Sequence, residues 1–124
     1  MLKKCKVRLP LESDLCEAFV RMFEYLQKCN QFRKRMYLIH IANEQGRNKI
    51  NYTKKLKRMG LKKGVADYCI MIEGGRVAFI EFKRHSKSDV SDAQRNFGDL
   101  CISFCTPYLL TWSVDDAIEW VRRL

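Results

Sequence analysis

Residues 65–83 read VADYCIMIEGGRVAFIEFK, and this stretch decides the fold of the chain. Two apolar runs, 65–72 and 77–83, flank a turn sequence of one glutamate, two glycines and one arginine over 73–76. Apolar runs of this length, rich in β-branched and aromatic residues and separated by glycines, predict two antiparallel strands joined in a β-hairpin.

The length of the hairpin loop decides which residue faces Asp67. We expect a three-residue loop over 73–75, because such loops commonly end in a glycine with a left-handed backbone. Asp67 then lies directly opposite Glu81. A two-residue turn would shift the register by one residue and place Asp67 opposite Phe82, with its side chain pointing away from Glu81.

Two charged residues interrupt the apolar pattern of the second hairpin strand. Glu81 and Lys83 are two positions apart and therefore point to one face, opposite to the apolar Ala78, Ile80 and Phe82. A charged face of an edge strand, which protects against aggregation, is the plain interpretation of such a pair. The apolar residues that precede the pair on the same face favour the mouth of a cleft instead.

A cleft that contains Asp67 and Glu81 side by side points to metal chemistry. Two adjacent carboxylates repel each other unless a proton or a cation lies between them. Hard oxygen ligands suit Mg²⁺ or Mn²⁺, with water in the remaining positions of an octahedron. Lys83 beside such an ion could orient or deprotonate an attacking water molecule, and the ion would stabilise charge on phosphoryl oxygens.

The remaining sequence predicts an α/β fold, with a mixed central sheet flanked by helices, in a single domain over 1–124. The order is helix, strand, basic segment, strand, strand, helix, strand, helix. Apart from the hairpin, the expected elements are a helix over 11–29, a strand over 36–42, a short helix over 51–59, a helix over 91–105, a strand over 108–112 and a last helix capped by Ser113.

The positive charge is concentrated in one segment. The chain of 124 residues has 24 lysines and arginines against 14 acidic residues, a net charge of +10 that indicates a polyanionic partner. No acidic residue lies between Glu44 and Asp67, and we interpret this stretch as a phosphate-contacting surface, with a solvated face as the alternative. Its cations are Arg47, Lys49, Lys54, Lys55, Lys57, Arg58, Lys62 and Lys63.

Composition excludes several other classes of protein. No apolar run approaches the length of a membrane span, and the N-terminal stretch MLKKCKVRLPLESD has no apolar region typical of a secretory signal. The six cysteines show no CxxC spacing, so we expect reduced, mostly buried thiols in a cytoplasmic protein. An iron–sulfur cluster on four scattered cysteines is the alternative for these residues.

Several stretches together resemble the VRR-NUC branch of the PD-(D/E)xK nucleases. The glycine-led aspartate motif of that branch resembles KGVADY at 63–68, and its catalytic strand resembles RVAFIEFKR at 76–84. Its Ser-x-x-Gln element resembles SDAQ at 91–94, and its closing strand and helix resemble PYLL and SVDDAIEW within 107–120. The resemblance extends in register over roughly 11–124 and implies a restriction-endonuclease-like fold.

The resemblance also implies roles for the hairpin residues. Asp67, Glu81 and the backbone carbonyl of Phe82 would bind Mg²⁺ or Mn²⁺, and Lys83 would be the catalytic lysine. The proline that precedes the aspartate in the family is replaced here by Ala66.

Two further site residues follow from the same resemblance. The first helix of the family supplies a glutamate, which aligns with Glu12, while Glu17 and Glu24 are alternatives. The Gln94 position in the family lies near the site and helps to position substrate or water. Gln94 could equally form a capping box with Ser91 at the start of a helix.

These observations predict a metal-dependent endonuclease that hydrolyses phosphodiester bonds in DNA, branched or duplex. Stand-alone modules of the family resemble Holliday-junction resolvases, and two symmetric cuts require two sites, so we expect a homodimer. A non-catalytic nucleic-acid-binding module, or a nuclease that acts on flaps or RNA, is the alternative. Neither a membrane nor a small-molecule cofactor is expected as a partner.

Overall fold

The computed structural model describes residues 8–42 and 50–124, and the hairpin expected from the sequence lies at its centre. Strand β2 (Tyr68–Ile72) and strand β3 (Arg76–Phe82) are antiparallel, and Cys69 faces Phe79 across the ladder. The loop between the strands has three residues, and its two glycines have φ of 100° and 86°. The prediction of a three-residue loop is confirmed, with the backbone that glycine adopts most readily.

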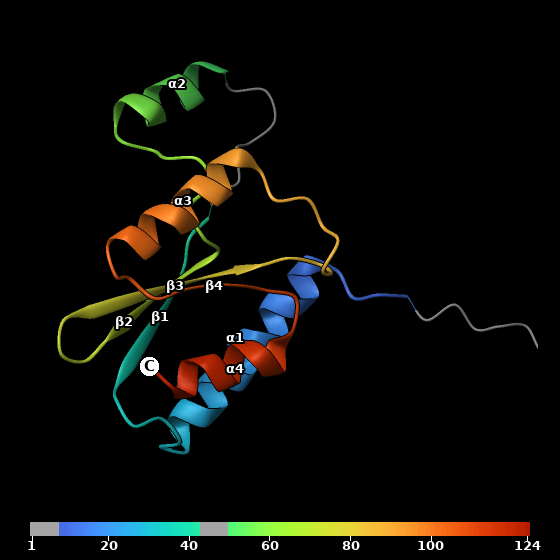
Figure 1. Cartoon of the computed structure of the whole chain (residues 1–124), viewed down its shortest axis with the longest axis vertical. Helices are drawn as coiled ribbons and strands as arrows, with labels where there is room; N and C mark the ends of the chain where they lie inside the picture. The colour runs from blue at the N-terminus through green and yellow to red at the C-terminus, as the bar shows by residue number, and fades with distance from the viewer. Residues whose placement is uncertain (1–7, 43–49) are drawn as a thin grey trace, which may run out of the picture.

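The hairpin forms the middle of a four-stranded sheet in the order β1-β2-β3-β4 (Figure 1). Strand β1 (Met36–His40) is antiparallel to β2, and strand β4 (Tyr108–Thr111) is parallel to β3. Helix α3 (Asp92–Ser103) lies in the connection between the two parallel strands. The expected mixed sheet and order of elements are therefore confirmed.

Helices α1 (Glu12–Lys28) and α4 (Val114–Arg122) pack against each other and cover one face of the sheet (Figure 1). The rings of Phe19 and Phe82 are both fully buried there, with 5.2 Å between their centroids. Burial of aromatic and aliphatic side chains at this interface supplies the main driving force for folding. The buried cluster consists of Leu15, Phe19, Phe23, Leu26, Met36, Tyr68, Ile70, Ile72, Ala78, Ile80, Phe82, Ala117, Ile118 and Val121.

Helix α3 packs on the opposite face of the sheet, over β3 and β4. Phe97 of α3 meets Phe79 edge to face at 5.1 Å and Tyr108 at 6.1 Å between ring centroids. The same face is open over β1 and β2, where the side chains of Tyr37 and Met71 are mostly exposed. Helix α3 therefore covers the part of this face that contains Glu81, which lies on β3 two residues after Phe79.

The strands are shorter than predicted where they approach Asp67. Strand β1 ends at His40, β2 begins at Tyr68 and β3 ends at Phe82. The Asp67 side chain accepts the backbone N–H of Phe82 at 2.7 Å, and the Asp67 carbonyl accepts the N–H of Ile41 at 2.7 Å. The carboxylate of Asp67 thus replaces a backbone acceptor, and the regular ladder stops.

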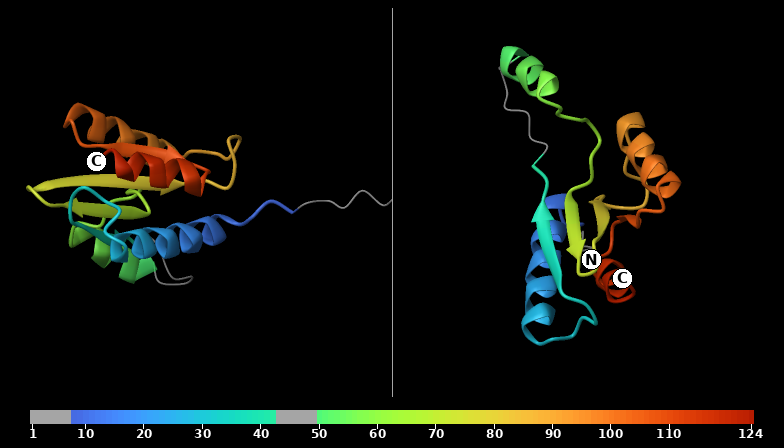
Figure 2. Two further views of the ribbon diagram at one scale, coloured as in Figure 1. Left: turned by 90° about the horizontal axis from the view of Figure 1, so that it is seen from below. Right: turned by 90° about the vertical axis from the view of Figure 1, so that its left-hand side faces the viewer.

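Helix α2 (Ile50–Arg58) occupies the basic segment, close to the range expected for it, and stands apart from the sheet (Figure 2). Gly60, at φ 105°, follows its last turn, as is typical after a helix end. In the described parts of the chain, no helix combines the length and the apolar character needed to cross a membrane.

Gly64 lets the loop before β2 approach the start of α3 closely. A Cβ atom at Gly64 would lie 2.2 Å from the backbone carbon of Ala93, and φ at Gly64 is +79°. Both the contact and the backbone angle exclude an ordinary side chain. Gly60 has an equally unfavourable φ, but a Cβ there would meet nothing within 4 Å.

We expect the substitution Gly64→Ala to destabilise the protein by about 2–4 kcal/mol, because overpacking adds to the cost of a left-handed backbone. The matched control, Gly60→Ala, has only the backbone cost, about 1 kcal/mol. Chemical denaturation of both variants measures the difference. Equal losses of unfolding free energy would contradict the close contact between Gly64 and α3.

Candidate active site

Asp67 is held from both sides at the junction of β1, β2 and β3. Its Oδ2 accepts the N–H of Phe82, and its backbone carbonyl accepts the N–H of Ile41 and lies 3.1 Å from Nδ1 of His40. These contacts fix both the backbone and the side chain of Asp67.

Three carboxylates from three parts of the chain come together at this point. Glu12 at the start of α1, Asp67 before β2 and Glu81 near the end of β3 each offer an oxygen, and these oxygens lie within 4.8 Å of one another. Among the described residues no other group of three or more histidine, cysteine or acidic side chains meets this criterion. Carboxylate oxygens at this spacing match the donors that a Mg²⁺ or Mn²⁺ ion takes.

The structure brings Glu12, rather than Glu17 or Glu24, to the cluster. Glu12 precedes the buried Phe19 by seven residues, which is close to two helical turns, so both lie on the face of α1 that packs on the sheet. The Glu17 side chain is 73% exposed and lies 4.0 Å from Arg21, and Glu24 is also exposed. In the sequence, the seven-residue spacing from Glu12 to Phe19 is the signal that distinguishes Glu12 from Glu17 and Glu24.

Burial raises the pKa of all three carboxyl groups, and repulsion from neighbouring carboxylates adds to the shift at Glu81 and Glu12. Glu81 is only 2% exposed, and burial together with the nearby Asp67 raises its pKa to about 8. Burial raises the pKa of Asp67, although the hydrogen bond from Phe82 opposes the shift. Burial also raises the pKa of Glu12, with Lys83 opposing and Asp67 reinforcing the effect. The cluster thus favours protons or a cation among its oxygens.

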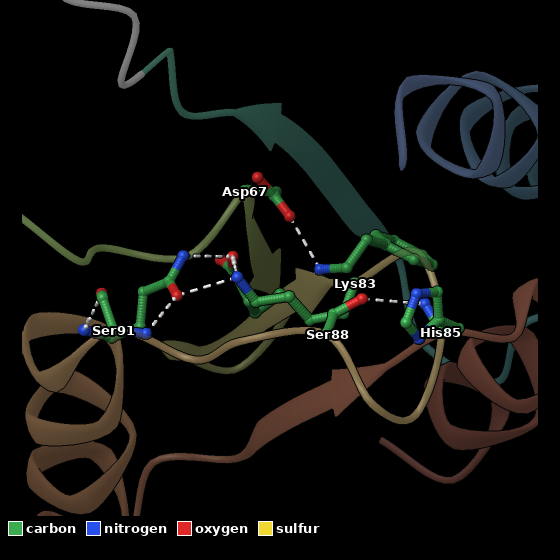
Figure 3. Close-up of polar contacts among 8 residues, drawn as sticks. Asp67, Lys83, His85, Ser88 and Ser91 are labelled. Carbon is green, nitrogen blue, oxygen red and sulfur yellow. Dashed lines mark hydrogen bonds and ion pairs between the residues drawn. The ribbon is translucent and has the colours of Figure 1, made fainter. Parts of the chain in front are cut away.

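Lys83 and Gln94 complete a partly buried polar network beside Glu81 (Figure 3). The Nζ atom of Lys83 donates to Oε1 of Gln94 at 2.8 Å and lies 3.9 Å from Oε1 of Glu81. Nε2 of Gln94 donates to the same Glu81 oxygen at 2.9 Å. The Lys83 side chain is therefore turned into the site and fixed there, and the residue is only 8% exposed.

Gln94 forms the expected capping box and also lies beside the acidic cluster. The Gln94 N–H donates to Oγ of Ser91 at 3.2 Å, and the Ser91 N–H donates to Oε1 of Gln94 at 3.0 Å, which is the expected capping box. The same Gln94 side chain contacts both Lys83 and Glu81. The start of α3 is thereby fixed to the acidic cluster.

An open cleft of about 310 Å³ lies over these groups. Its walls come from the acidic cluster, from the loop before β2 and from the start of α3. The lining residues are Glu12, Lys63, Gly64, Val65, Asp67, Glu81, Ser91, Ala93 and Gln94. A volume of this size is at the lower end of the range of ligand-binding sites.

The predicted basic residues have different positions relative to the cleft. Lys63 lines the cleft, and Lys62 precedes it in an exposed position. Four exposed cations are on α2, which stands away from the sheet: Lys54, Lys55, Lys57 and Arg58. Arg47 and Lys49 lie outside the described residues.

The described cysteines form no group that could hold a cluster. Within 8–42 and 50–124 the thiols of Cys16, Cys29, Cys69, Cys101 and Cys105 are free. Only Cys101 among them is buried, so the expectation of mostly buried thiols is wrong for the described residues. None of these cysteines belongs to the acidic group. Within the described residues, none of them lies close enough to two other histidine, cysteine or acidic side chains to form a group of three metal ligands. Burial raises the pKa of the Cys16 thiol to about 12, so it is a neutral packing group.

Comparison with solved structures identifies the fold. One solved structure, described as a VRR_NUC domain protein, matches with a TM-score of 0.69 and 17% sequence identity, covering 94% of this chain and 89% of that chain. No family model matches the sequence, and no curated protein matches it significantly. The chain therefore has the VRR-NUC fold, as the motifs of the sequence imply.

We expect the metal-free protein to lose stability as pH rises from 4.5 to about 8. In this interval folded Glu81, with its pKa near 8, keeps a proton that the unfolded chain has released. Glu81 then makes the unfolding free energy decrease with pH by at most about 1.4 kcal/mol per unit. Denaturation curves in chelator over this pH range measure the slope.

Two variants test the origin of this slope. Glu81→Gln removes the group whose pKa is raised to about 8 and is expected to reduce the slope of the pH dependence. Glu119→Gln changes an exposed glutamate of α4 and is expected to leave the dependence as in the wild type. Parallel curves for Glu81→Gln and wild type would show that another group is responsible.

Proposed function

We propose that this protein is a metal-dependent nuclease that hydrolyses phosphodiester bonds in DNA. The observation on which this rests is the group of three carboxylates, from Glu12, Asp67 and Glu81, with the buried Lys83 ammonium beside it. A module that merely binds nucleic acid has no reason to bury carboxylates where they face a polyanion. The VRR-NUC fold of the chain supports the same activity.

In this proposal the three carboxylates and the backbone carbonyl of Phe82 hold Mg²⁺ or Mn²⁺. The bound cation would neutralise charge on the phosphoryl oxygens. Lys83, held by Gln94, would orient the attacking water molecule. In its neutral amine form, which the field of the cation favours, it would accept the water proton, and the departing O3′ would take up a proton in turn. Water adds to phosphorus as the bond to O3′ breaks, which leaves a 5′-phosphate and a 3′-hydroxyl group.

The cations of the basic segment would hold the phosphate backbone of the substrate. Lys63 lines the cleft itself, and α2 presents four exposed cations at a distance from the sheet. Contacts of this kind bind many sequences alike, because phosphates are present in every sequence. We therefore infer selectivity for the structure of DNA, as in resolution of a four-way junction, rather than for its sequence.

We further propose a two-fold homodimer. Two symmetric cuts in a junction need two sites related by symmetry. The exposed apolar side chains of Tyr37 and Met71, on the open part of the sheet, are available for such a contact. Light scattering on the purified protein measures the mass, and a monomer at the concentrations used for cleavage would contradict this part of the proposal.

We expect Lys83→Ala to reduce cleavage by about 10²-fold or more, because a positioned acid–base group contributes this much. Labelled four-way junction, flap, duplex and single-stranded DNA are incubated with Mg²⁺, Mn²⁺ or EDTA. The matched control is Lys87→Ala, which removes an exposed lysine of the following loop and is expected to cut like the wild type.

The same assay distinguishes the alternative functions. Metal-dependent cutting that disappears in Lys83→Ala but persists in Lys87→Ala supports the nuclease. Preference for flaps or for RNA would replace the proposed junction substrate and keep the activity. Salt-dependent binding without cleavage of any substrate would identify a non-catalytic nucleic-acid-binding module.

We expect removal of cations from α2 to weaken DNA binding without affecting the metal site. Lys54→Ala combined with Lys55→Ala would lower the slope of log affinity against log salt by about 1 for each phosphate that the protein no longer neutralises. The control, Lys28→Ala combined with Arg33→Ala, removes the same charge from the last residue of α1 and the segment that follows it, at the opposite end of α1 from Glu12. Titrations by fluorescence anisotropy with equal slopes for both double variants would contradict a contact between α2 and DNA.

A further inference from the structure

Arg84 follows Lys83 at the end of β3 and reaches in the opposite direction, toward the segment that precedes α1. Its Nε donates to the carbonyl of Pro10 at 3.2 Å, and its Nη2 donates to the carbonyl of Leu9 at 3.1 Å. One guanidinium group therefore bridges two consecutive backbone carbonyls. The planar fork of arginine suits such a bridge, whereas a lysine ammonium lacks this fixed pair of donors.

The alternation of β3 explains why Arg84 points to α1. Ala78, Ile80 and Phe82 are fully buried on the face that α1 covers, and Arg84 is the next residue of this series. Lys83 belongs to the alternate series, and its side chain reaches Glu81 and Gln94 instead. Two consecutive residues thus connect the end of β3 to two different parts of the site.

The beginning of α1 has a weak cap of its own. Leu11 is the N-cap residue, and a leucine side chain cannot accept a hydrogen bond from the first turn. Only the other half of a capping box is present, in which the backbone N–H of Leu11 donates to Oδ2 of Asp14 at 2.8 Å. Helix ends without a complete cap fray, and Glu12 is the first residue of this helix.

The placement of Glu12 therefore depends on contacts from outside the helix. The packing of Phe19 on Phe82 fixes α1 about two turns further on. Arg84 holds the chain at Leu9 and Pro10, on the other side of Glu12. With both sides fixed, the Glu12 carboxylate stays within 4.8 Å of the other two carboxylates.

We propose that Arg84 is a positioning residue, which holds the start of α1 so that Glu12 completes the divalent-cation site. This inference rests on the proposed function, because it takes Glu12 as a ligand of the cation. Partners of this kind, which contact a ligand residue or its backbone rather than the metal, strongly affect the affinity for the metal.

The sign of the effect separates positioning from simple electrostatics. The positive charge of Arg84 by itself disfavours a second cation nearby, so its removal would strengthen binding of Mn²⁺ if charge were the whole effect. Removal of the two hydrogen bonds would release Glu12 and weaken binding. A weaker affinity in a variant that lacks the charge therefore indicates positioning.

The test is a double-mutant cycle on the affinity of the full-length protein for Mn²⁺, measured by isothermal titration calorimetry without DNA. We expect Arg84→Ala to weaken binding by about tenfold. We expect Glu12→Gln to weaken it as well, and the addition of Arg84→Ala to Glu12→Gln to cause no further decrease. Arg84→Lys, which keeps the charge and part of the hydrogen bonding, is expected to fall between wild type and Arg84→Ala.

The control for charge and for general stability is Arg35→Ala. Arg35 is exposed, lies at the hairpin end of the sheet and forms an ion pair with Glu73 at 3.0 Å. Arg35→Ala removes the same formal charge as Arg84→Ala and a comparable surface contact. We expect this variant to bind Mn²⁺ with the affinity of the wild type. A cooperative unfolding transition, measured for each variant in chelator, confirms that the compared proteins are folded. If Arg84→Ala does not fold, Arg84→Lys replaces it in the comparison with the wild type.

Each outcome has a distinct meaning. A decrease of affinity in Arg84→Ala that disappears in the Glu12→Gln background supports positioning. An equal decrease in both backgrounds, or tighter binding in Arg84→Ala, overturns the role of Arg84 while the cation site stands. A wild type that binds no Mn²⁺, or a Glu12→Gln variant that binds normally, overturns the cation site that includes Glu12, and the inference with it.

Discussion

The site depends first on one hydrogen bond, from the backbone N–H of Phe82 to Oδ2 of Asp67. This bond ends the ladder between β2 and β3 and turns the Asp67 side chain into the position that the next backbone acceptor would occupy. Asp67 and Glu81 are consequently side by side at the end of the hairpin, rather than on separate strands of a continuous sheet. A hairpin register shifted by one residue would remove this arrangement entirely.

A cluster of three carboxyl groups, one of them buried, is unfavourable by itself, and the surrounding contacts compensate for it. Glu81 is almost fully buried, yet it receives a hydrogen bond from Gln94 and has the Lys83 ammonium nearby. Within the described residues, every buried side-chain nitrogen or oxygen has a hydrogen-bond partner. Polar networks that are satisfied in this way hold one geometry, which is the property that a metal-binding or catalytic site requires. A cation that binds the folded state alone would add further stability.

Each layer of the fold contributes one part of this network. The hairpin supplies Glu81 and Lys83, α1 supplies Glu12 from the face that packs on the sheet, and α3 supplies Gln94 from its first turn. The aromatic contacts of Phe19 with Phe82 on one face, and of Phe97 with Phe79 on the other, fix these helices relative to β3. The apolar core and the polar site are therefore built on the same strand, with the core on one set of alternate residues and the site on the other.

The sequence by itself determined the elements of this protein and the register of its hairpin, which brings Asp67 close to Glu81. These features are local: glycines permit the turn, and the alternation of apolar residues sets the faces of the strand. The capping box of Ser91 and Gln94 is local for the same reason. Tertiary structure decided that Glu12 meets the hairpin, that Gln94 also contacts Lys83, and that Arg84 holds the start of α1. These contacts join residues far apart in the chain, and the packing of buried side chains, rather than any local spacing, sets the distance between them.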